Sequence, residues 1–258
     1  MHRFLETAIF VVNQTQRKML LTQLQSQSKA YAQLAGVLYL IIAVIGAFSI
    51  GYVPSVIVAE GNAALTFQQL TNHLNLFKLG MAGDIAVLVF EVLLTVLLYK
   101  LFKRYSATGM TIATFTRLAM AIIMGVNLLN YVVPVLFITH PELASTLQKD
   151  ELETLTLLFF KIHHYGILTW QLFFAIHLFT LGYVIQKSVI TSKWLGILML
   201  VGGIGYGGDS LVQLLFLNSQ ALSIFFSCLL VLAVIGEFWF AFWLIVNGGQ
   251  QLSANSND

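Results

Sequence analysis

Ionisable and amide side chains occur inside long apolar stretches of this sequence, where chemistry or a binding site would need them. In the centre of a bilayer each ionised group costs at least about 2.5 kcal/mol, so such residues are retained for a function or for a buried partner. The ionisable ones are Asp84, Glu91, Arg117, Lys161, His163, His164, His177, Asp209 and Glu237. Amides accompany them at Asn127, Asn130, Gln171 and Gln213.

One group of these residues shares a depth in the membrane. With a rise of about 1.5 Å per helical residue, its members fall roughly 10 to 15 Å below the outer surface. Carboxylates, imidazoles and amides at one depth could open together toward outer water or a lipid headgroup, provided that four helices meet around one cavity. Because His163 and His164 are adjacent, about 100° apart on a helix, we expect one of them to point inward. The ligand-binding candidates are therefore Asp84, Asn127, Asn130, His163, His164 and Asp209.

A second group, Glu91, Arg117 and Glu237, falls roughly 13 to 15 Å above the inner surface. A guanidinium between carboxylates from different helices is what a buried charge needs in order to remain ionised. We interpret this group as a structural charge cluster that fixes helix packing. The alternative is that the surplus carboxylate titrates in function, and the sequence does not tell which Glu pairs with Arg117.

The same positions carry residue types that can bind a metal. Imidazole and carboxylate both bind zinc, so His163 or His164 with Asp84 and Asp209 could form a site. However, the sequence has no HExxH spacing, and His177 lies about 21 Å from His163 along one helix, too far for one ion. Cys228 is the single cysteine. We therefore predict no metal, no cofactor and hydrogen-bonded packing histidines.

The elements that must position these residues follow from composition. Of 258 residues, 58% are apolar and 9% are charged, whereas a soluble domain carries about 25% charged residues. A spanning helix needs roughly 20 mostly apolar residues. The sequence predicts an all-α, polytopic transmembrane bundle with six spans, at Tyr31 to Val53, Leu79 to Tyr99, Ala107 to Phe137, Leu157 to Gln186, Trp194 to Leu217 and Ala221 to Val246.

Basic residues give the expected orientation, because Lys and Arg resist translocation. Most of the thirteen flank one side of the predicted spans, which places both termini inside the cell: Arg3, Arg17, Lys18, Lys29, Lys100, Lys103, Arg104, Lys187 and Lys193. We expect residues 1–29 to be a cytoplasmic or interfacial segment, 30–247 the transmembrane domain and 248–258 a disordered tail. Topology explains the basic residues, and the net charge is only +2, so no nucleic-acid partner is expected.

Glycines crowd the fifth predicted span, which reads Gly202-Gly203-Ile204-Gly205-Tyr206-Gly207-Gly208-Asp209. Gly203 and Gly207 form a small-xxx-small pair that allows close approach of a neighbouring helix. The alternative is a broken helix that exposes backbone groups to a ligand beside Asp209.

Several motifs together resemble one known family. They are Lys161-Ile162-His163-His164-Tyr165-Gly166, Phe174-Ala175-Ile176-His177-Leu178, Leu181-Gly182-Tyr183, Leu195-Gly196-Ile197-Leu198, Gly205-Tyr206-Gly207-Gly208-Asp209-Ser210, Arg117, and Gly125-Val126-Asn127-Leu128-Leu129-Asn130. The chain from about Ala30 to Gly249 resembles the bacterial integral-membrane family catalogued as domain of unknown function 4386. The resemblance implies a six-helix architecture and supplies no activity or ligand.

The leading functional interpretation is a protein of the cytoplasmic membrane that binds a small amphipathic or lipid-like molecule in an outward-facing polar pocket. Its partners would be membrane lipids and that ligand. One alternative is an intramembrane enzyme in which Asp84 and Asp209 act as an acid/base pair on an isoprenoid or lipid. The other is a non-catalytic accessory subunit whose polar residues only pack helices.

Overall fold

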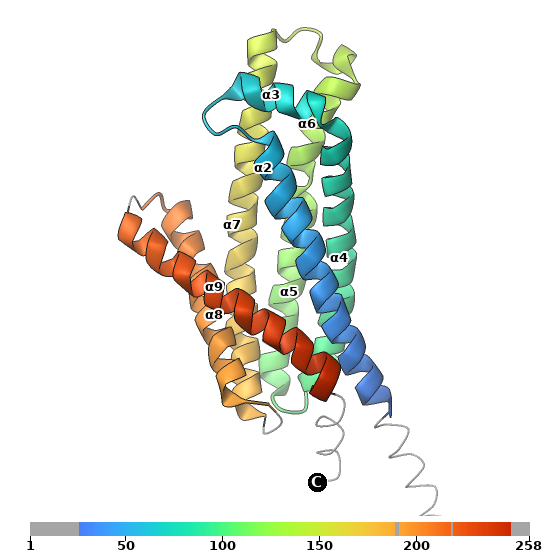
Figure 1. Cartoon of the computed structure of the whole chain (residues 1–258), viewed down its shortest axis with the longest axis vertical. Coiled ribbons are helices and arrows are strands. Elements are labelled where there is room, and N and C mark those ends of the chain that lie inside the picture. The colour runs from blue at the N-terminus through green and yellow to red at the C-terminus, as the bar shows by residue number, and fades with distance from the viewer. Residues whose placement is uncertain (1–25, 189–190, 218, 249–258) are drawn as a thin grey trace, which may run out of the picture.

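The computed structural model describes residues 26–188, 191–217 and 219–248. Within them, six helices are long and apolar enough to cross a membrane, and they lie together as a bundle (Figure 1). Each contains most or all of a predicted span, which confirms the all-α, polytopic architecture. The orientation of the termini stays a prediction. The spans are Ser26–Ile57, Leu74–Phe102, Ala107–Thr139, Lys149–Lys187, Lys193–Leu214 and Gln220–Gly248.

The first span changes its winding along its length. Residues 26–46 are α-helical, the π-helix η1 covers Ala47–Tyr52, and the short helix α2 covers Val53–Ile57. Pro54 lies in the first turn of α2. Because proline has no amide hydrogen and clashes with the carbonyl four residues earlier, the regular hydrogen-bond ladder cannot run through this point. The helix widens to π geometry immediately before it.

A short helix, α3 (Ala63–Asn72), lies across the end of the bundle, in the connection between the first two predicted spans (Figure 1). The Asn62 side chain caps it by accepting a hydrogen bond of 3.0 Å from the amide of Leu65. Leu70 of α3 is buried against a cluster of aromatic side chains that includes Phe77. This end of the bundle, called the α3 end below, is therefore covered.

The second span is α4 (Leu74–Phe102), and the third consists of α5 (Ala107–Asn127) and α6 (Leu129–Thr139). The third span breaks at Leu128, and Pro134 lies inside α6. Proline removes the hydrogen bond to residue 130, so this span cannot be one regular helix. A 3-10 turn, η2 (Pro141–Ala144), follows it.

The remaining spans are α7 (Lys149–Lys187), α8 (Lys193–Leu214) and α9 (Gln220–Trp243), which ends in the π-helix η3 (Leu244–Gly248). α7 begins eight residues before its predicted start, with a capping box formed by Gln148 and Glu151. In Figure 1, α8 and α9 form a hairpin that tilts away from α7 toward the α3 end.

α8 is a continuous helix through its glycine run, so the structure contradicts the alternative of a broken helix beside Asp209. A Cβ at Gly203 would lie 2.8 Å from the Ala175 carbonyl of α7, and a Cβ at Gly205 would lie 2.9 Å from the Leu229 side chain of α9. The glycines thus allow α8 to approach both neighbours closely.

The structure does not describe most of the two predicted terminal segments. Residues 1–25 of the expected cytoplasmic or interfacial segment, and 249–258 of the expected tail, lie outside the described residues.

Candidate functional site

A cavity of about 430 Å³ lies inside the bundle between the first span and helices α4, α5, α7, α8 and α9. Most of its wall is aliphatic or aromatic. Its ionisable and amide lining residues are Asp84, Glu91, Arg117, His163, Gln171 and Glu237, with the phenols of Tyr39 and Tyr206.

Asp84 of α4 and His163 of α7 form the first polar part of the wall. Their exposed fractions are 5% and 1%. Neither oxygen of the Asp84 carboxylate, nor Nε2 of His163, has a hydrogen bond of ordinary geometry within the described residues. The Ser49 hydroxyl of η1 interacts with the Asp84 carboxylate from the first span. Apart from this interaction, the described residues leave the buried hydrogen-bonding capacity of the Asp84 carboxylate and of His163 Nε2 unused.

An aromatic cluster separates these two residues from the α3 end. The His163 ring stacks on Tyr131 of α6 with centroids 3.5 Å apart. Tyr131 in turn packs against Phe77 at 4.9 Å and Phe160 at 5.4 Å, beneath Leu70 of α3. The expectation that the predicted layer opens toward this end is therefore corrected: large aromatic side chains and α3 cover it.

Asn127 and Asn130 do not line the cavity. Asn127 donates a 2.9 Å hydrogen bond to the backbone carbonyl of His163, and Asn130 donates one of 2.9 Å to Asn127. A Cβ at Gly166 would overlap the Asn127 side chain, so that glycine makes room for the amide. Asn127 thus joins the kinked third span to α7, and Asn130 bonds to Asn127 from within the same span.

His164 and Asp209 are also separate from the cavity. His164 faces a shallow hollow with Gln213, whose side-chain oxygen lies 3.2 Å from His164 Nε2. Gln213 donates a 2.9 Å hydrogen bond to Asp209. The six candidates thus do not surround one cavity, and Asp209 does not line the wall that holds Asp84, as an acid/base pair would require. Residues at the same depth in the membrane therefore point in different directions from their helices.

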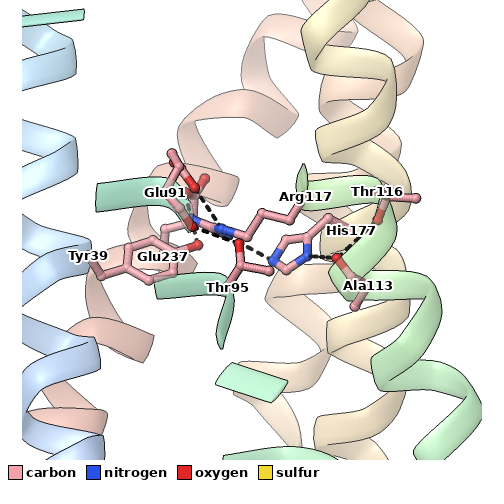
Figure 2. Close-up of polar contacts among 8 residues, drawn as sticks. All are labelled: Tyr39, Glu91, Thr95, Ala113, Thr116, Arg117, His177 and Glu237. Atoms are coloured by element: carbon pink, nitrogen blue, oxygen red, sulfur yellow. Dashed lines mark hydrogen bonds and ion pairs between the residues drawn. The ribbon is translucent and has the colours of Figure 1, made fainter. Parts of the chain in front are cut away.

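Arg117 of α5 is the centre of the second polar part, as Figure 2 shows. Its Nε lies 2.7 Å from the Glu91 carboxylate of α4, with side-chain exposures of 2% and 7%. Glu91 is therefore the ion-pair partner that the sequence could not choose. The pair joins the second and third spans at a point shielded from water.

His177 of α7 completes the polar environment of Arg117 (Figure 2). Its Nε2 lies 2.9 Å from a terminal guanidinium nitrogen, and its Nδ1 lies 2.8 Å from the carbonyl of Ala113. Because a guanidinium only donates and a carbonyl only accepts, Nε2 must be the acceptor and Nδ1 the donor. The imidazole is thus the neutral tautomer with hydrogen on Nδ1, and it joins α7 to α5.

Glu237 of α9 takes phenols as partners. Tyr39 of the first span donates to it over 3.4 Å and Tyr206 of α8 over 3.3 Å. The Tyr39 ring also lies against the Arg117 guanidinium, 5.2 Å from ring centroid to Cζ. The cluster therefore includes every span, and His177, Tyr39 and Tyr206 are members that the sequence analysis did not assign to it. In the sequence, the only sign of the two phenols was that the Glu237 carboxylate, inside an apolar span, needed a hydrogen-bond donor.

Within the part of the chain that the structure describes, no group of three or more His, Cys, Asp or Glu side chains is arranged to hold a metal ion.

The model of one protein family, described as a domain of unknown function (DUF4386), matches residues 34–248. The chain belongs to this family. As a DUF4386 protein with six candidate spans, it is a multi-pass membrane protein. It is also similar to an uncharacterized protein of Archaeoglobus fulgidus, with 37% identity over 94 residues, which are 34% of this chain and 53% of that protein. The chain thus aligns with about half the length of that relative. No solved structure matches the chain.

Proposed function

We propose that this membrane protein binds a small amphipathic molecule in the cavity, with the polar group of the ligand hydrogen-bonded to Asp84 and His163. The observation that carries the proposal is that both residues are buried in the wall of one mostly apolar cavity, while both Asp84 carboxylate oxygens and His163 Nε2 lack hydrogen bonds of ordinary geometry. Ligand sites are typically apolar cavities with a few well-placed polar groups.

The energetics favour an occupied site. A buried polar atom without a partner costs about 1 to 3 kcal/mol. A ligand hydroxyl can donate its one hydrogen to the Asp84 carboxylate and accept a hydrogen bond from the His163 imidazole when Nε2 carries hydrogen, so it would remove part of that cost. The volume of about 430 Å³ falls within the range of about 300 to 1,000 Å³ for small-molecule sites.

The Arg117 cluster supports the same proposal as a rigid part of the wall. Arg117 already has Glu91 and His177 as partners, and Glu237 accepts from two phenols. These contacts connect all six spans without needing the ligand. Asp84 and His163, by contrast, retain buried polar atoms without a hydrogen bond of ordinary geometry.

Native mass spectrometry of protein extracted gently in mild detergent tests the proposal. We expect a defined adduct that fragmentation identifies as one small amphipathic compound, and we expect Asp84→Asn and His163→Ala to reduce its occupancy. The matched control is Asp150→Asn, an exposed carboxylate in the first turn of α7. If only random phospholipid adducts are found, or if the three variants behave alike, the proposal fails and the accessory-subunit interpretation gains.

A further inference from the structure

Part of the cavity wall is exposed in the described structure. Among its lining residues, the exposed ones come from two elements, the first span and α9: Ala47, Gly51, Val234 and Phe238. Val234 and Phe238 are 45% and 39% exposed. All four lie within candidate membrane spans. Their surroundings in the membrane are therefore lipid and not water.

Glycines keep this side of the cavity free. An added Cβ at Gly46 or at Gly51 would meet no atom within 4 Å. Both residues contribute to the cavity wall or its edge on the first span. At most other helical glycines of the bundle, by contrast, an added Cβ would press on a neighbouring helix. These two glycines thus do not serve helix contact.

The opening is bounded at its lower end by a close helix contact. An added Cβ at Gly36 would lie 2.6 Å from the carbonyl of Ala241 of α9, so the two backbones touch there. Figure 1 shows the first span and α9 meeting near the end of the bundle opposite α3 and separating toward the α3 end. At the α3 end, Tyr131 and its aromatic neighbours cover the cavity.

We infer that the gap between the first span and α9 is a lateral portal, through which a single-chain amphiphile enters the cavity from the bilayer. The inference rests on the proposed function and names its ligand class. A volume of about 430 Å³ lies at the lower part of the range of about 300 to 1,000 Å³ for small-molecule sites, which suits one chain better than a two-chain phospholipid. A terminal hydroxyl would reach Asp84 and His163, as a long-chain alcohol provides.

The test uses a long-chain fatty alcohol that carries a diazirine in mid-chain, dissolved in phosphatidylcholine vesicles with the reconstituted full chain. After illumination, mass spectrometry locates the label on α5. Surface lipid reaches Ile122 and Val126, which are 67% and 63% exposed. A chain inside the cavity reaches Ala121 and Met124, each 8% exposed and part of the wall.

We expect label on Ala121 and Met124 in the native chain, and its loss in Gly46→Trp and Gly51→Trp, where the open space admits an indole. The matched control, Val44→Trp, places the same side chain on the lipid-facing side of the same helix, where Val44 is 66% exposed, and should keep the internal label. Label confined to Ile122 and Val126 in the native chain overturns the inference, as does internal label that survives both glycine variants.

Failure of the portal and failure of the proposed function give different results. If native mass spectrometry finds an Asp84-dependent adduct while the alcohol labels only surface positions, the cavity is filled by another route and the proposed function stands. If both the adduct and the internal label are missing, both proposals fail.

Discussion

Arg117 and His177 share a hydrogen bond of 2.9 Å in the interior of the bundle, and its direction is fixed because His177 Nδ1 is committed to the Ala113 carbonyl. The neutral imidazole accepts from the guanidinium and holds α7 against α5. Glu91 binds the other side of the same guanidinium. Together these contacts explain how a cation is retained deep inside a span: its ion-pair partner Glu91 and its hydrogen-bond acceptor His177 come from two other helices.

Replacing His177 by Leu should destabilise the protein, because a buried guanidinium nitrogen loses its acceptor. A hydrogen bond to a charged group contributes about 1.5 to 3 kcal/mol, and we expect a loss of that size. His177→Gln, which still offers an oxygen acceptor, should lose less. Unfolding in mixed micelles with increasing SDS measures both. His164→Leu is the control, since that ring is exposed, and equal losses at the two histidines would contradict the assignment.

Replacing Glu91 or Glu237 by the neutral Gln should change the free energy of unfolding by different amounts. Breaking a buried ion pair by removing one partner costs about 3 to 5 kcal/mol, so we expect Glu91→Gln to lower the free energy of unfolding strongly. Glu237→Gln should cost less because its partners are neutral phenols. A double-mutant cycle of Arg117→Met with Glu91→Leu should show that the two residues are coupled. The double variant should lose less free energy of unfolding than the sum of the two single losses.

Two glycine substitutions should have opposite effects. In Gly203→Ala the new methyl would press on the α7 backbone at 2.8 Å, and overpacking of this kind costs about 1 to 3 kcal/mol. In Gly46→Ala the methyl enters open space, and the gain in helix propensity of up to about 1 kcal/mol should raise stability slightly. The same SDS titration compares them, and a stabilising Gly203→Ala would contradict the packing role of the run.

The orientation predicted from the basic residues can be tested with reporters. A fluorescent reporter that folds only in the cytoplasm, fused to the C-terminus, should be bright, and an alkaline phosphatase fusion at the same place should be inactive. Fusions in the 140–148 connection should give the reverse pattern. A dark C-terminal reporter with active phosphatase would overturn the orientation, although not the bundle itself.

The sequence predicted the bundle well because membrane spans are set by long apolar runs, which are local. It also predicted Arg117 as the centre of a charge cluster, because an unpaired guanidinium in a span demands partners. It did not choose Glu91 over Glu237, since that choice depends on helix rotation, which side-chain packing across the bundle decides. The same cause separates Asp209 from Asp84: their depths agree, but Asp84 lines the cavity and Asp209 does not.

The portal and the α3 helix could not be predicted for related reasons. α3 is too short to be found as an apolar span, although the Asn62 cap is a local signal for the start of a helix. The free space beside Gly46 depends on the angle between the first span and α9, because the same residue type at Gly36 makes a tight contact instead. A glycine in a span thus indicates either close packing or open space, and only the structure tells which.

The most direct test of the central claim is to fill the cavity and ask whether the bound molecule is lost. Ala121 lines the cavity, and its neighbour Ile122 faces lipid with 67% exposure. Native mass spectrometry should show the retained amphiphile in the native chain and in Ile122→Phe, and its loss in Ala121→Phe. Thermal unfolding should show that the two variants are equally well folded. An adduct that persists at full occupancy in Ala121→Phe would show that the molecule binds elsewhere, and would contradict the assignment of this cavity as the binding site.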